Sequence, residues 1–164
     1  MGIATAGLIN PEWAEALKEM LWADGYVDYY IETNNHGDNV PIGLDDAEGI
    51  RVNFRYLDYV TGLMFRETAN AAAADIYFAQ VDAQFFDSPE DEGTLGYAAI
   101  EFNGTREYFE IVYVDNEAEN GNDDIVIKHE TGHALGLGHP YGDGFNPNFT
   151  QDDTIMSYNY PPSG

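Results

Sequence analysis

Residues 129–139 read HETGHALGLGH, and this one stretch contains three of the four histidines in the chain. His129 and His133 are four residues apart, so on a helix both imidazoles project from one face toward a shared point. Gly136 suits the end of such a helix, because glycine tolerates the left-handed conformation of a sharp turn, and that turn brings His139 back to the same point. Three neutral histidines with one open coordination position are typical of a catalytic zinc site, whereas structural zinc sites close with four protein ligands.

Glu130 follows the first of these histidines directly and can reach a water on the metal without becoming a ligand itself. A carboxylate in that position is the expected general base of a hydrolytic reaction. The chain has no cysteine, so a transition metal must be held by nitrogen and oxygen donors. The fourth histidine, His36, falls in a polar loop, and we assign it no role.

The charge of the chain excludes two classes of partner. Thirty Asp and Glu residues oppose six Lys and Arg residues, which gives a formal net charge of -24. Nucleic acids and anionic lipid surfaces are bound through basic patches, so neither is an expected partner. This composition suits a secreted or salt-adapted protein, since dissolved ions screen its self-repulsion. We expect a monomer.

Neither a membrane span nor a leader is visible in the sequence. No apolar run reaches the roughly 20 residues that a membrane-spanning helix needs. The first residues lack the basic region and the long apolar stretch of an intact signal peptide, so we expect a secreted domain whose leader is not part of this chain. The 164 residues fit one domain, with an N-terminal subdomain at residues 1–138 and a C-terminal subdomain at residues 139–164.

Apolar periodicity predicts an α+β fold, with one twisted sheet, two main helices and an irregular tail. Helical spacing is found at residues 11–24, 45–61 and 123–135. Strand-like patterns are found at residues 25–32, 63–68, 75–79, 94–102 and 108–114. Asn10 is the expected cap of the first helix, and Gly62 suits the position just past the end of the second.

The histidine stretch and a later segment together resemble a known family. The later segment is Thr154-Ile155-Met156-Ser157-Tyr158, and with the histidine run it resembles the metzincin signature and its Met-turn. Pro140 directly after the third histidine, and Tyr158 two residues beyond Met156, make the chain most similar to the catalytic domain of serralysins. Matrix metalloproteinases share the histidine run without that tyrosine, and astacins usually carry Glu after the third histidine.

The resemblance implies a mostly parallel sheet with an antiparallel edge strand, and roles for further residues. Met156 would form the hydrophobic floor beneath a zinc ion held by the three histidines. Tyr158 would bind that zinc as a fourth, displaceable ligand and then stabilise the reacting carbonyl. The antiparallel edge strand that pairs with substrate is expected at Gly96, Tyr97, Ala98 and Ala99.

The expected activity is that of a zinc-dependent endopeptidase, which hydrolyses peptide bonds of extended protein substrates through a zinc-bound water activated by Glu130. Two alternatives stay open. One is a catalytically silent zinc-binding module of the same fold, and the other is a zinc amidase that acts on a non-protein substrate. The carboxylate of Glu130 argues against the silent module, because such a module has little use for it.

Two features depart from the serralysin pattern. Serralysins usually continue past the Met-turn into another helix and calcium-binding repeats, and this sequence ends at Gly164. We expect either a trimmed chain or a minimal member in which the helix at residues 11–22 covers the exposed apolar surface. The acidic stretch at residues 115–124 is a candidate calcium site, with a solvated acidic turn as the favoured alternative because the EF-hand spacing is absent.

Overall fold

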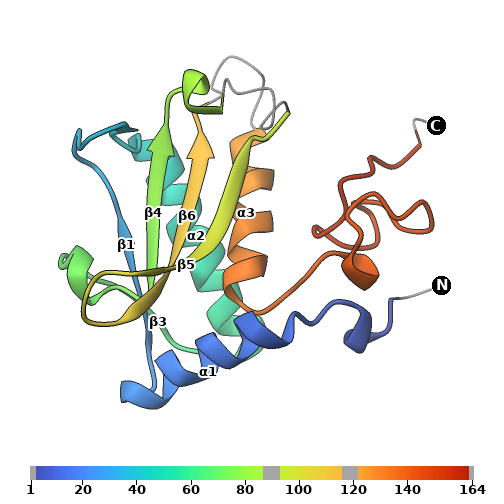
Figure 1. Cartoon of the computed structure of the whole chain (residues 1–164), viewed down its shortest axis with the longest axis horizontal. Helices are drawn as coiled ribbons and strands as arrows, with labels where there is room; N and C mark the ends of the chain where they lie inside the picture. Colours follow the sequence, from blue (N-terminus) through green and yellow to red (C-terminus); the bar gives the residue numbers. More distant parts are fainter. Residues whose placement is uncertain (1–2, 87–92, 116–121, 163–164) are drawn as a thin grey trace.

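A mixed sheet with helices packed against one face forms the centre of the fold (Figure 1). The computed structural model describes residues 3–86, 93–115 and 122–162. The sheet has six strands: β1 (Val27–Ile31), β2 (Asn39–Val40), β3 (Phe65–Glu67), β4 (Ile76–Val81), β5 (Gly96–Phe102) and β6 (Glu107–Val114). The expected α+β class is therefore confirmed. The short strand β2 lies in a stretch where the sequence indicated only a polar loop.

The strands run in the order β3-β1-β4-β6-β5. The pairs β1–β3, β1–β4 and β4–β6 are parallel. Strand β5 pairs antiparallel with β6, from Gly96 opposite Tyr113 to Phe102 opposite Glu107, and it ends the order. Strand β2 pairs antiparallel with the far end of β4. A mostly parallel sheet with an antiparallel edge strand is thus present, as expected.

The described residues contain three α-helices, which match the three segments of helical spacing in the sequence, although the expected fold counted only two of them as main helices. They are α1 (Pro11–Asp24), α2 (Leu44–Thr61) and α3 (Asn122–Ala134), and the short 3-10 turns are η1 (Thr5–Gly7), η2 (Ala71–Ala73), η3 (Ala83–Phe86) and η5 (Pro140–Gly142). Helix α1 is integral to the fold because Leu17 and Met20 are buried in the main core. Its predicted cap is confirmed, since the Asn10 side chain accepts hydrogen bonds from the backbone N–H groups of Glu12 and Trp13.

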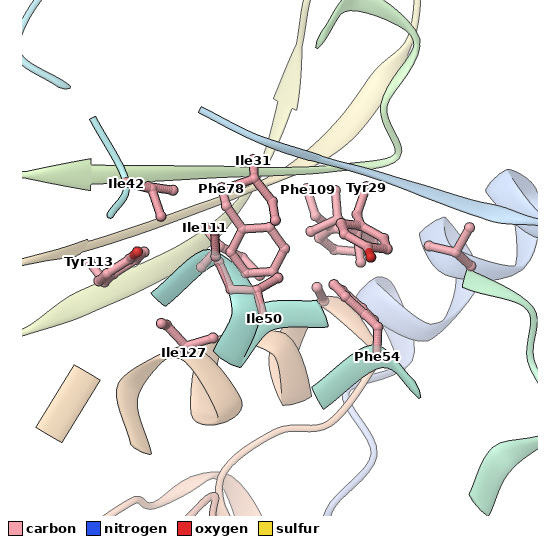
Figure 2. Packing of buried hydrophobic residues seen from close by; sticks show 14 of the residues in the cluster. Tyr29, Ile31, Ile42, Ile50, Phe54, Phe78, Phe109, Ile111, Tyr113 and Ile127 are labelled. Atoms are coloured by element: carbon pink, nitrogen blue, oxygen red, sulfur yellow. The ribbon is translucent and has the colours of Figure 1, made fainter. Parts of the chain in front are cut away.

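The main core lies between the sheet and the helices (Figure 2). Burial alternates along β1, so that every second side chain faces the helices. Phe54 of α2 stacks on Tyr29 of β1, with ring centroids 4.3 Å apart, and meets Phe78 of β4 edge-on. Ile127 brings α3 into the same core. These contacts fix α3 against the sheet, and α3 carries the first part of the histidine stretch.

The chain after α3 is irregular, as its sequence predicted. Gly136 has a φ of 86° and ends the helix, in agreement with its expected role. The following residues up to 162 form turns and the single 3-10 turn η5 within the described part of the chain. Among the described residues, no helix combines the length and the apolar character that crossing a membrane requires.

Candidate metal centre

Three histidines meet beside the C-terminal half of α3. His129 and His133 lie on α3, and His139 lies in the loop immediately before η5. One ring nitrogen from each of them comes within 4.8 Å of the others. Within the described residues, no second group of three or more His, Asp or Glu side chains meets this condition. The spacing of the sequence motif has therefore produced the convergence that it predicted.

The geometry of this cluster fits a tetrahedral zinc ion. The Nε2 atoms of His129 and His139 are 3.3 Å apart. Two nitrogen ligands that each lie about 2.0–2.1 Å from zinc at a tetrahedral angle are also about 3.3 Å apart. The chemistry of the donor set fits as well, because imidazole nitrogens are common zinc ligands and the cluster leaves a position open.

Two of the three rings are held by backbone carbonyls. The Nδ1 atom of His129 is 2.8 Å from the carbonyl oxygen of Ile155, and the Nδ1 atom of His133 is 2.8 Å from that of Leu137. A carbonyl can only accept, so Nδ1 carries the proton and Nε2 keeps its lone pair for a metal. Such contacts fix both the tautomer and the direction of a ligating histidine.

Burial also keeps the rings neutral. It lowers the pKa of His133 to about 4, although the hydrogen bond to Leu137 opposes the change. Burial lowers the pKa values of His129 and His139 too, and the carboxylate of Asp143 partly opposes the effect at His139. At neutral pH all three rings are therefore unprotonated at one nitrogen, which is the form that binds metal.

Glu130 is buried next to the cluster, with 6% of its surface exposed. Burial raises the pKa of its carboxyl to about 7, and a hydrogen bond from the backbone of Ala98 in β5 opposes the shift. A carboxyl group with a pKa near 7 can both take up and release a proton at neutral pH, as a general base that later acts as an acid requires.

Tyr158 packs directly on two of the histidines. Its ring stacks on His129 with centroids 5.1 Å apart, and it lies 4.7 Å from the His139 ring. Phe145 packs against the Tyr158 ring, and the backbone N–H of Tyr158 donates a hydrogen bond to the carbonyl of Gly144. The side chain keeps 42% of its surface exposed, so the phenol is beside the cluster and still open to solvent.

Met156 lies under the same helix. It is fully buried, and a Cβ atom built on Gly132 would come 2.6 Å from its sulfur. Gly132 therefore allows the close approach of Met156 to α3 between the two helical histidines. The surrounding turn is held by a hydrogen bond from the Ser157 N–H to the carbonyl of Thr154.

A cleft of about 430 Å³ opens in front of these groups. His129, Glu130 and Tyr158 line it, together with Gly96 at the start of β5. Of the other expected edge-strand residues, Ala98 reaches the site through its backbone contact with Glu130. Tyr97 packs on Phe86, and Ala99 is not among the cleft residues.

Sequence reasoning missed several residues of the cleft wall, namely Ile125, Val126, Phe145, Gln151 and Tyr160. Two of them had a usable signal, because Ile125 and Val126 precede His129 and Glu130 by four residues on the same helix and so share their face. Phe145 and Tyr160 come from irregular chain, in which no periodicity indicates direction.

The candidate calcium stretch at residues 115–124 is largely outside the described residues, which end at Asp115 and resume at Asn122. His36 lies in an isolated β-bridge with Asn39 and makes no part of the histidine cluster.

Comparison with models of known protein families finds no match. The chain is 32% identical over 124 residues to a protein named hatching enzyme from Paracentrotus lividus. The similar region covers 66% of this chain and 21% of that protein, so the chain spans about a fifth of its relative. Independently of this similarity, the three-histidine cluster has the donor set of a zinc site.

Proposed function

We propose that this chain is a zinc-dependent endopeptidase of the metzincin class, which hydrolyses peptide bonds in extended protein substrates. The observation that carries the proposal is the meeting of three ligand nitrogens within 4.8 Å beside a buried glutamate in one cleft. Pro140 and Tyr158 favour the serralysin-type branch within the class. The turn around Met156 fits a Met-turn that supports the metal site from below.

His129, His133 and His139 would hold the zinc ion through their Nε2 atoms. When bound, zinc polarises the scissile carbonyl and lowers the pKa of a coordinated water. Glu130 takes the proton of the attacking water and then delivers it to the leaving amine. Burial of Glu130 favours its protonated form, which helps this carboxyl to hold the proton between the two steps. No residue of the chain becomes covalently attached to the substrate.

Tyr158 has two successive roles in this proposal. Its phenol would be a fourth ligand for the metal in the resting site, and it would move aside to donate a hydrogen bond to the oxyanion during the reaction. The exposure of 42% of the side chain supports such a movement, because part of the Tyr158 ring is open to solvent.

The substrate would bind along β5. This strand pairs only with β6 among the described strands, so its other edge can pair with an extended peptide. Backbone pairing contributes affinity that does not depend on the amino-acid sequence of the substrate. The apolar wall of Leu95, Val126 and Phe145 favours an apolar substrate side chain next to the cleaved bond.

We further propose a secreted monomer with no nucleic-acid or membrane partner, divided into subdomains at residue 138.

Two other functions compete with this proposal. A silent zinc-binding module would have no need of a buried carboxylate whose pKa is raised toward 7. A zinc amidase for small molecules would use the same chemistry and would have no need of an open strand edge beside the site. The edge strand therefore favours a peptide substrate.

The test is cleavage of casein, a disordered protein, by the zinc-loaded chain. Wild type, Glu130→Ala and His133→Ala are compared, with zinc content measured for each. We expect cleavage by the wild type, retained zinc without cleavage for Glu130→Ala, and loss of both for His133→Ala. A zinc-loaded wild type that leaves casein intact would refute the endopeptidase assignment.

A further inference from the structure

The loop that carries the third histidine is paired with a segment from the start of the chain. Ile9 and Leu137 form an isolated antiparallel bridge. On either side of it, the N–H of Asn10 donates to the carbonyl of Gly136 at 2.9 Å, and the N–H of Gly138 donates to the carbonyl of Leu8 at 2.6 Å. The backbone from Gly136 to Gly138, directly before His139, is therefore paired with residues 8–10.

Side chains extend this contact to the histidine helix. The Trp13 ring meets the His133 ring edge-on, with centroids 4.7 Å apart. A Cβ atom on Gly136 would lie 2.9 Å from the Cα atom of Ala14, so the helix end and α1 are in close contact. In addition, the carbonyl of Leu137, whose backbone is bridged to Ile9, accepts the hydrogen bond that orients His133.

The same contact continues past His139. Tyr141 has a φ of 54°, a left-handed conformation that costs energy for a bulky residue. Its ring lies over Gly7, where an added Cβ would come 2.7 Å from the ring, and it stacks on Phe149. Thus the contact runs along the whole loop on both sides of the third histidine.

The three histidines differ in what orients them. Backbone carbonyls hold the rings of His129 and His133. Among the described residues, the His139 ring has a hydrogen-bond contact with His129 alone, at the nitrogen that faces the cluster. Its position therefore depends on the path of its backbone, and that path is fixed by the pairing with the start of the chain.

We propose that residues 7–14, the N-terminal clasp, are a positioning element of the metal site, which sets the place of His139 and braces His133. The clasp touches neither the metal nor the substrate and acts through the histidines. This inference rests on the proposed zinc site. It predicts that damage to the clasp weakens zinc binding more than it weakens the fold.

The test compares two substitutions at one position in the full-length chain. Asn10→Pro and Asn10→Ala both remove the helix cap, but only Asn10→Pro also removes the N–H that donates to Gly136. Asn10 has a φ of -93° and an extended conformation and precedes a proline, so proline is tolerated there better than at most positions. The zinc dissociation constant is measured by competition with a chelating dye, and the cobalt(II) absorption spectrum reports ligand number.

We expect Asn10→Pro to bind zinc about tenfold or more weakly than Asn10→Ala, in the range found when groups behind metal ligands are removed. Its cobalt spectrum should shift as one nitrogen ligand is lost, while the zinc-free unfolding midpoints of the two variants stay close. Equal zinc affinities and equal spectra would overturn the proposal. A wild type that binds zinc without cleaving casein refutes only the proposed function, whereas a wild type that binds no zinc overturns both.

A second pair of variants covers the case in which Asn10→Pro does not fold. Ala14→Leu pushes α1 away from Gly136 and keeps a strong helix former. Glu19→Leu places the same leucine at an exposed position of α1 and serves as the reference for an added apolar side chain on this helix. Weaker zinc binding by Ala14→Leu than by Glu19→Leu supports the clasp, and equal binding overturns it.

Discussion

Two glutamates in this molecule have similarly little exposed surface, and the pKa values of their carboxyls are shifted in opposite directions. Glu130 has 6% of its surface exposed, and Glu32, at the end of β1, has 7%. Burial raises the pKa of Glu130 to about 7, with one backbone hydrogen bond from Ala98 against it. Burial acts in the same direction on Glu32, but hydrogen bonds outweigh it, and the pKa is lowered.

Two causes separate the carboxylates: Glu130 is the more deeply enclosed, so desolvation acts more strongly on it, and Glu32 has more hydrogen-bond donors around it. Glu32 accepts hydrogen bonds from the backbone and side-chain amides of Asn34, at 2.8 and 3.2 Å, and from the Tyr77 hydroxyl at 2.8 Å. Its charge is satisfied, and it anchors the loop after β1. Glu130 has spare acceptor capacity that faces a cleft. Burial alone thus does not indicate function, whereas burial with unsatisfied capacity beside ligand nitrogens does.

The largest expected effect is on turnover. Glu130→Gln should lower kcat for casein about 10²- to 10⁴-fold with zinc content unchanged, because an amide cannot accept the water proton. Glu32→Gln, assayed below its unfolding midpoint, should keep kcat within about twofold, because Glu32 lies in a different part of the sheet. Equal losses of kcat in the two variants would contradict a catalytic role that Glu130 has and Glu32 lacks.

The next effect concerns the stability of the zinc-free protein. Because the pKa of Glu130 is raised from 4.5 to about 7, the folded state holds a proton that the unfolded state releases, and stability is lost as the pH rises from 4.5 through 7. On going from pH 4.5 to pH 8, the free energy of unfolding of Glu130→Gln should therefore rise by up to about 3 kcal/mol relative to that of the wild type. Urea unfolding at the two pH values measures this, and a pH-independent difference would contradict the raised pKa.

Glu32→Gln should show the opposite sign and a smaller size. The lowered pKa of Glu32 means that its stabilisation is present above pH 4.5 and disappears as the pH falls through the lowered value. The variant should be about 1–2 kcal/mol less stable than wild type at pH 7, in line with the loss of charged hydrogen bonds. This deficit should shrink in acid. A stability deficit of Glu32→Gln that grows as the pH falls would show that hydrogen bonds to the charged carboxylate are not the source of the stabilisation.

The smallest effect is that of salt. With a net charge of -24, raising the salt concentration from 0.1 M to 1 M should raise the unfolding midpoint by a few degrees, or about 1 kcal/mol, as screening shortens the reach of repulsion. The differences between the two glutamate variants should change little, because both positions are buried. A midpoint that stays flat or falls would reject the role of surface repulsion.

The sequence predicted the parts of the molecule that local chemistry controls. Asn10 and Gly136 have the capping and turning roles that their residue types favour. The strands appear within a few residues of their predicted positions, since alternation of apolar residues is a local signal. The histidine convergence was equally local, because helical geometry and one glycine turn determine it.

The parts that sequence reasoning missed depend on contacts between distant residues. Nothing near Ile9 indicates a partner at Leu137, and nothing in the polar stretch around Asn39 indicates that it pairs with β4. The integral role of α1 was underestimated for the same reason, because it rests on contacts with α3 and the core. The opposite pKa values of Glu32 and Glu130 also require the neighbours of each carboxylate, which the sequence does not give.

The bridge between Ile9 and Leu137 also bears on how the protein is made. A ribosome releases the chain from its N-terminus at about 5–20 residues per second. The segment around Ile9 emerges before the segment around Leu137, and it can pair only after that later segment has followed. Contacts between such distant positions slow folding, because a large loop must close before they form. A nascent chain should therefore acquire the proposed metal site only after the loop around Leu137 has been synthesised and has paired with Ile9.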